Sequence, residues 1–179
     1  PTRSCPTPPN SMHCSTRRSE GGSSAARGAG RLEARPTRGE RHRLMVDGGE
    51  ALLIDESYNA NPASMRATLK TLAQQEVEGR RIAVLGSMRE LGAGSDGFHA
   101  ALAEPIADAR VEYAILVGEE MGALAKALGQ KVNFEHVPDV ASAIGLAREE
   151  IGPGDAILVK GSNSIGLFAL VEALAGGKS

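Results

Sequence analysis

The chain has 179 residues, of which 41% are hydrophobic and 3% aromatic, and its formal net charge is −2. This length predicts one domain with an appendage, and the composition predicts a core of Leu, Ile, Val and Ala. No apolar run is long enough to span a membrane and no secretory signal opens the chain, so we expect a soluble, cytoplasmic protein. Cys5 and Cys14 could form a disulfide, but no Cys/His cluster has the spacing of a metal site.

The charge is unevenly distributed. Residues 1–43 contain nine arginines and three acidic residues, a net charge of +6. A basic arm of this kind raises nucleic-acid binding as an alternative. The first thirty residues, however, are rich in Ser, Arg, Pro and Gly and have no aromatic residue to stack on a base. We therefore expect no nucleic-acid partner, and interpret residues 1–38 as a disordered or non-native segment that precedes a domain over residues 39–179.

The first elements of that domain have clear boundaries. Two apolar runs around residues 47–49, Asp-Gly-Gly, predict a β-hairpin. Asn61 then predicts a helix cap, and Pro62 suits the first helical position. The helix that follows carries Met65, Leu69 and Leu72 at helical spacing.

The rest of the chain alternates strands and helices. Strands are predicted at residues 81–86, 113–118, 132–137 and 155–161. Between them, the periodicity predicts one helix carrying Phe98, Leu102 and Ile106, a short helix over residues 121–128 and a helix capped by Asp139; a last helix carries Leu167, Leu170, Val171 and Leu174. This order predicts an α/β fold, a Rossmann-like open, mostly parallel sheet with helices on both faces. In such sheets ligands bind at the carboxyl ends of the strands, here after Asp55, Gly86, Gly118 and Lys160.

The loop after the first long apolar run, residues 55–62, is Asp-Glu-Ser-Tyr-Asn-Ala-Asn-Pro. A polar turn with a helix cap explains Asn61 and Pro62. It explains Asp55, Tyr58 and Asn59 poorly, because a short loop seldom needs so many different hydrogen-bonding groups. The second interpretation is a ligand loop, with carboxylates for hydroxyls or a metal-bound phosphate and amides for a polar ring.

The other strand ends are less specific. The glycine-rich loop over residues 86–99 has neither the Gly-Lys-Ser/Thr step nor a dinucleotide fingerprint, so it is interpreted as a turn. His99 is either a structural histidine or a second-rank functional candidate. Lys160 could hold a phosphate or carboxylate, and Ser162 or Ser164 could cap the next helix. Arg43 is either part of a solvated basic linker or a hinge arginine that reaches a phosphate.

Three motifs together resemble one family. "LIDESYNANPASM", "RIAVLGSMRELG" with a downstream His, and "ILVKGSNSIGL" resemble the C-terminal domain of bacterial Mur ligases. The "YNANP" loop resembles the branch that adds D-alanyl-D-alanine to UDP-N-acetylmuramoyl-tripeptide, and it argues against a folylpolyglutamate-type sister ligase. The resemblance implies an ATP-dependent carboxylate–amine ligase of peptidoglycan synthesis that works through an acyl phosphate. It also implies ATP and Mg²⁺ as cofactors, with Mg²⁺ held mainly by a central domain outside this chain.

The resemblance also implies roles for individual residues. ATP contacts are expected at Arg43, Asp55, Glu56, Asn59 and Ser162, and substrate contacts at Tyr58, Asn61, His99 and Lys160. No catalytic residue or metal ligand is expected in this chain alone. Ser87 departs from the family, which usually has Asp there. Because no phosphate-loop domain is present, we expect the isolated chain to be inactive; the alternative is a stand-alone, non-catalytic nucleotide-binding module.

Overall fold

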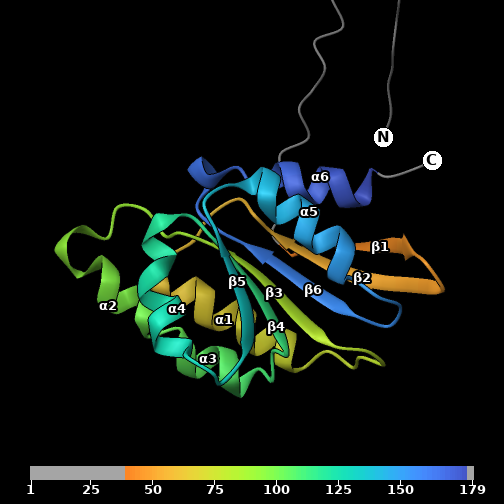
Figure 1. Ribbon diagram of the computed structural model, residues 1–179, viewed down its shortest axis with the longest axis horizontal. Helices are drawn as coiled ribbons and strands as arrows, with labels where there is room; N and C mark the ends of the chain where they lie inside the picture. Colours follow the sequence, from red (N-terminus) through yellow and green to blue (C-terminus); the bar gives the residue numbers. More distant parts are fainter. Residues whose placement is uncertain (1–38, 177–179) are drawn as a thin grey trace, which may run out of the picture. The chain divides into compact units, whose positions relative to one another are not determined.

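The computed structural model describes residues 39–176, so the predictions for residues 1–38 and for the two cysteines lie outside the described residues. The described part forms a six-stranded sheet in the order β1-β2-β6-β3-β4-β5 (Figure 1). The strands are β1 (Glu40–Val46), β2 (Gly49–Glu56), β3 (Arg81–Gly86), β4 (Tyr113–Val117), β5 (Asn133–Val137) and β6 (Ala156–Lys160). Strands β2 to β6 pair in parallel and β1 pairs antiparallel with β2, which confirms the predicted open, mostly parallel sheet.

The predicted hairpin is present at the β1 edge. Val46 pairs with Gly49, so the connection has two residues, Asp47 and Gly48. Gly48 has φ of 90°, a conformation that favours glycine and suits the twist of a two-residue hairpin loop.

Two hydrophobic layers cover the sheet. The helices are α1 (Pro62–Ala73), α2 (Ser95–Ala100), α3 (Ala103–Asp108), α4 (Gly122–Leu128), α5 (Val140–Glu150) and α6 (Phe168–Ala175). Helices α1, α3 and α4 lie on one face and α5 and α6 on the other (Figure 1). Within the described range, no helix is both long enough and apolar enough to cross a membrane.

The prediction of one helix carrying Phe98, Leu102 and Ile106 is wrong. The structure has two short helices there, and Phe98 is 43% exposed while Leu102 and Ile106 are buried. The break falls at residues 101–102, four positions before Pro105. A proline ring has no N–H to donate and clashes with the carbonyl four residues earlier, here that of Ala101.

The connections decide where the sheet can open at its carboxyl edge. After β2 the chain continues into α1 on one face, whereas after β6 it continues into α6 on the other face. Crevices therefore arise on both sides of β6, between β2 and β6 and between β6 and β3. The second crevice is filled, because the backbones of Gly86 and Gly161 nearly touch: a Cβ on Gly161 would lie 3.0 Å from the Cα of Gly86. The β2–β6 side is the one that remains open.

Candidate functional site

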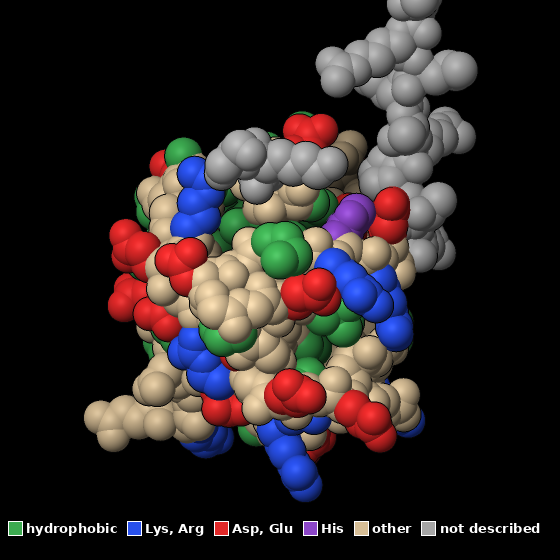
Figure 2. All heavy atoms as spheres, turned by 90° about the vertical axis from the view of Figure 1, so that its right-hand side faces the viewer, with side chains coloured by type: hydrophobic (Ala, Val, Ile, Leu, Met, Phe, Trp, Pro, Cys, Tyr) green, Lys and Arg blue, Asp and Glu red, His purple; other side chains and the backbone are tan. Residues whose placement is uncertain are grey.

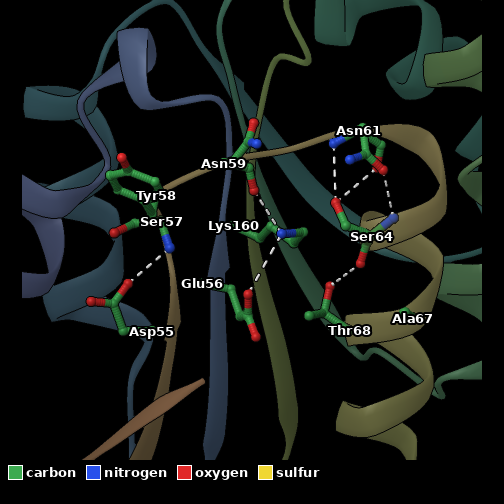
Figure 3. A pocket seen from close by; sticks show the side chains of 10 residues that line it. All are labelled: Asp55, Glu56, Ser57, Tyr58, Asn59, Asn61, Ser64, Ala67, Thr68 and Lys160. Carbon is green, nitrogen blue, oxygen red and sulfur yellow. Dashed lines mark hydrogen bonds and ion pairs between the residues drawn. The ribbon is translucent and has the colours of Figure 1, made fainter. Parts of the chain in front are cut away.

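A pocket lies at the carboxyl ends of β2 and β6, beside the first turns of α1 (Figure 3). Its volume is about 240 Å³. It is lined by Asp55, Glu56, Ser57, Tyr58, Asn59, Asn61, Ser64, Ala67, Thr68 and Lys160. Six of the nine residues predicted to bind nucleotide or substrate are in this group, so one strand end and one loop carry most of the expected site.

Asp55 and Glu56 point to opposite sides of β2, as successive strand residues must (Figure 3). Asp55 is 6% exposed, and its Oδ1 accepts a hydrogen bond of 2.8 Å from the backbone N–H of Ser57. Glu56 instead points into the pocket toward Lys160. The two carboxylates do not converge on one point, and no cluster of three His, Cys, Asp or Glu side chains suited to a metal occurs in residues 39–176. These residues alone do not fit a Mg²⁺ site.

Lys160 is 2% exposed and lines the pocket from the end of β6. Its Nζ donates a hydrogen bond of 2.7 Å to the backbone carbonyl of Asn59 and lies 3.7 Å from Oε2 of Glu56. A buried ammonium needs such partners, because removing a charge from water is costly. The ammonium thus joins the end of β6 to the loop that follows β2.

Asn61 caps helix α1 as predicted. Its Oδ1 accepts a hydrogen bond of 2.8 Å from the N–H of Ser64, and Ser64 Oγ accepts one of 3.1 Å from the N–H of Asn61. This reciprocal pair fixes the direction in which the chain enters α1. The cap explains Asn61 structurally, and its contact with substrate stays a prediction.

The face that the loop offers to solvent is built from Tyr58 and Asn59, which are both exposed. Between them and β2, Ser57 is 1% exposed, and its Oγ has no hydrogen-bond partner in the described residues. Leaving a buried hydroxyl unpaired costs about 1–3 kcal/mol. Ser57 was not among the candidates from sequence; its burial depends on tertiary packing, so no local pattern could single it out.

Three predicted residues lie away from the pocket lining. Ser162 Oγ accepts a hydrogen bond of 2.9 Å from the N–H of Arg89 and makes no helix-cap bond. The N-cap position of α6 is Leu167, so neither Ser162 nor Ser164 caps that helix, and the contact of Ser162 with ATP stays a prediction.

His99 is fully buried, accepts at Nε2 from the N–H of Met88 (2.9 Å) and donates from Nδ1 to the carbonyl of Ser95 (2.8 Å). One ring nitrogen thus binds the loop after β3 and the other binds the first residue of α2, and this packing disfavours a direct substrate contact.

The third is Arg43, which is on the edge strand β1. Its side chain is 82% exposed and lies 3.6 Å from Glu50. Its cross-strand neighbour is Leu52, three positions before Asp55. Figure 2 shows this hairpin side of the molecule, where basic and acidic side chains are interspersed. Arg43 is therefore a largely exposed residue of the sheet edge that pairs with Glu50, and its contact with a nucleotide phosphate remains a prediction.

Ser87, at the position where the resemblance implies an Asp, is fully buried directly after β3. The pKa of the nearby Glu120 carboxyl is lowered: its own backbone N–H is the largest cause, and the Ser87 hydroxyl and the Arg89 guanidinium add to it. Arg89 also forms an ion pair with Glu120. A carboxylate is thus present beside position 87, although it comes from the segment after β4.

Comparison with known proteins identifies the family. A family model described as "Mur ligase, glutamate ligase domain" matches residues 40–163. The chain belongs to the Mur ligase family. Among relatives in the family, UDP-N-acetylmuramoyl-tripeptide--D-alanyl-D-alanine ligase of Mycobacterium tuberculosis (strain CDC 1551 / Oshkosh) is 36% identical over 178 residues. The protein of the same name from Escherichia coli (strain K12) is 38% identical over 125 residues, covering 69% of this chain and 26% of that protein.

Solved Mur ligases share the fold. A crystal structure of MurF from Acinetobacter baumannii matches with a TM-score of 0.65 and 28% identity, over 80% of this chain and 32% of that chain. A MurF ligase structure from Thermotoga maritima, in complex with ADP, matches with a TM-score of 0.62 at 21% identity, which bears on the fold alone. The sequence resemblance to the D-alanyl-D-alanine-adding branch is confirmed. The chain spans about a third of the length of these relatives, since the M. tuberculosis match covers 87% of this chain but 35% of the relative.

Proposed function

We propose that this chain is the C-terminal domain of an ATP-dependent ligase that adds D-alanyl-D-alanine to UDP-N-acetylmuramoyl-tripeptide in the cytoplasm. The observation that carries the proposal is the pocket at the ends of β2 and β6: its lining loop is the "YNANP" segment, within the region shared with relatives that bear this name. In the proposed reaction, the tripeptide carboxylate attacks the γ-phosphorus of ATP, and ADP leaves. The dipeptide amine then attacks the acyl carbon and loses a proton, phosphate leaves, and an amide bond forms.

The pocket supports a role in positioning reactants. Its volume of about 240 Å³ is below the 300–1,000 Å³ typical of small-molecule sites, so it would hold only part of a nucleotide or dipeptide. A second domain that closes over this edge would complete the site and exclude water. In this proposal Asp55, Glu56 and Asn59 meet the nucleotide, while Tyr58 and Asn61 face the dipeptide. Mg²⁺, which neutralises phosphate charge during transfer, would be held outside the described residues.

A chimera tests the proposal directly. Residues 39–179 are fused behind the N-terminal two-thirds of the M. tuberculosis relative, with that relative's own C-terminal domain as the matched control. We expect ATP- and dipeptide-dependent formation of the UDP-linked pentapeptide, detected by mass spectrometry, while the isolated 179-residue chain gives no turnover. A folded chimera without activity would contradict the proposal.

Calorimetry with ATP distinguishes the proposed ligase domain from the alternative, a stand-alone nucleotide-binding module. A domain that supplies half of a site should bind ATP weakly by itself, with a dissociation constant of about 1 mM or above, which corresponds to about 4 kcal/mol. Micromolar binding of ATP to the isolated chain would favour the stand-alone module instead.

A further inference from the structure

Lys160 is buried on the α1 face of the sheet, which makes its charge unusual. Along β6, Ala156 and Leu158 belong to the hydrophobic core beneath α1, and Lys160 follows them on the same face. It is among the largest fully buried side chains of the described chain. An apolar residue would fill this position without the cost of desolvating an ammonium.

The position of the ammonium indicates what the charge does. Glu56 is the register partner of Lys160 across the β2–β6 pair, so this carboxylate is a counter-ion supplied by the neighbouring strand. The short 2.7 Å bond goes instead to a backbone group, the carbonyl of Asn59 (Figure 3). A hydrogen bond from a charged donor is roughly twice as strong as a neutral one.

The loop between β2 and α1 is therefore fixed along its backbone. The N–H of Ser57 is bound to Asp55, the carbonyl of Asn59 to Lys160, and Asn61 is fixed by its capping pair with Ser64. Ala60, between the last two, is 5% exposed and packs in the core. With its backbone fixed in this way, the loop presents the side chains of Tyr58 and Asn59 to solvent.

We infer that Lys160 is a positioning residue, which holds the Tyr58–Asn61 loop in its binding conformation through the Asn59 carbonyl and does not itself contact substrate. This inference rests on the proposed function, because it takes this loop to be the ligand face. It replaces the sequence-based prediction that Lys160 holds the dipeptide. Glu56 supplies the compensating charge. The hydrogen bond from Lys160 to the Asn59 carbonyl holds the loop at a fixed position relative to β6.

The test uses the full 179-residue chain without ligand and compares Lys160→Met, Glu56→Gln and the double variant. The readout is the ¹⁵N NMR order parameter of residues 58–60, together with urea unfolding. Lys160→Met leaves Glu56 without its cation, so both stability and loop order should fall. The double variant removes both charges of the pair, so its stability should recover toward wild type. Its loop order parameters should stay below about 0.6, compared with about 0.85 for rigid backbone. Glu56→Gln alone should leave the loop ordered.

Two outcomes would overturn the inference. One is a double variant whose loop is as rigid as that of wild type, since the Asn59 contact would then be dispensable. The other is a loop that loosens equally in Glu56→Gln and Lys160→Met, which would assign the ordering to the ion pair. These measurements need no ligand, so they test the positioning role of Lys160 separately from the ligase proposal. The chimera assay tests the ligase proposal.

Discussion

At the scale of single residues, the site is organised by hydrogen bonds from individual side-chain atoms to backbone groups. Asp55 uses Oδ1 for the N–H of Ser57, and His99 uses Nε2 for the N–H of Met88 in the loop after β3 and Nδ1 for the carbonyl at the start of α2. Such contacts distinguish residues that hold the backbone from residues whose side chains are exposed. Tyr58 and Asn59 are exposed, whereas His99 and Lys160 are buried and hydrogen-bonded to backbone groups.

Asn61 allows its cap role and its proposed substrate role to be measured separately. Asn61→Ala removes the acceptor for the Ser64 N–H and should lower the free energy of unfolding by about 1 kcal/mol, measured by urea denaturation. Asn61→Asp keeps the acceptor and should retain wild-type stability. In the chimera, Asn61→Asp should still reduce ligation if Asn61 has its proposed role, because the variant replaces an amide with a carboxylate beside the proposed dipeptide position. Full activity in this variant would show that the side chain only caps the helix.

Glu120 should make stability depend on pH. Its folded-state pKa is lowered from the ordinary value of 4.5, first by its own backbone N–H and then by Ser87 and Arg89. The stabilising contribution is therefore present above about pH 4.5 and is lost as the pH falls through the folded-state pKa. The difference in unfolding free energy between wild type and Glu120→Gln should be constant above about pH 5 and shrink in more acidic buffer. Glu119→Gln is the control for charge alone, and a difference that stays constant down to pH 3 would argue against this assignment.

At the scale of elements, the close contact of β3 with β6 keeps the second crevice shut. The N–H of Ser162 donates to the carbonyl of Ser87 across it, at 3.3 Å. Gly86 and Gly161 leave no room for side chains between the two strand ends, and Leu167 packs over them. As a result, the described carboxyl edge opens beside β2, where the polar loop follows.

Gly161→Ala tests this closure. The new Cβ would meet the side chain of Leu167 at 2.7 Å and the backbone of Gly86 at 3.0 Å. Overpacking of this kind costs about 1–3 kcal/mol, so the variant should unfold at a lower urea concentration. The control is Gly97→Ala in α2, where nothing lies within 4 Å of the added methyl and helix propensity favours alanine. Equal stability of Gly161→Ala and wild type would mean that the two strands can separate without cost.

At the scale of the whole molecule, both hydrophobic layers are made from residues between Leu44 and Leu174. We therefore predict that a chain starting at residue 39 folds by itself. The midpoint of its thermal unfolding should match that of the full chain, as monitored by far-UV circular dichroism. A large drop in the midpoint would show that the preceding residues contribute to the core.

The sequence by itself determined the local features of this protein. Buried parallel strands produce continuous apolar runs, so the strands at residues 81–86 and 113–117 and the alternation with helices were readable. Asn61-Pro62 marks a helix start through its own chemistry, and it did so here. The polar loop at the end of β2 was located because ligand sites follow strand ends in this class of sheet.

Only the tertiary structure decided which strands are neighbours. The runs that form β3, β4 and β6 look alike, and nothing in them specifies that β6 lies between β2 and β3. That order brings the ammonium of Lys160 to the carbonyl of Asn59, 101 residues away in the chain, which supports the inferred positioning role of Lys160. The burial of Ser57 and the exposure of Arg43 likewise depend on packing. Local patterns encode the period and the ends of an element, whereas the partner of each side chain is set by long-range pairing.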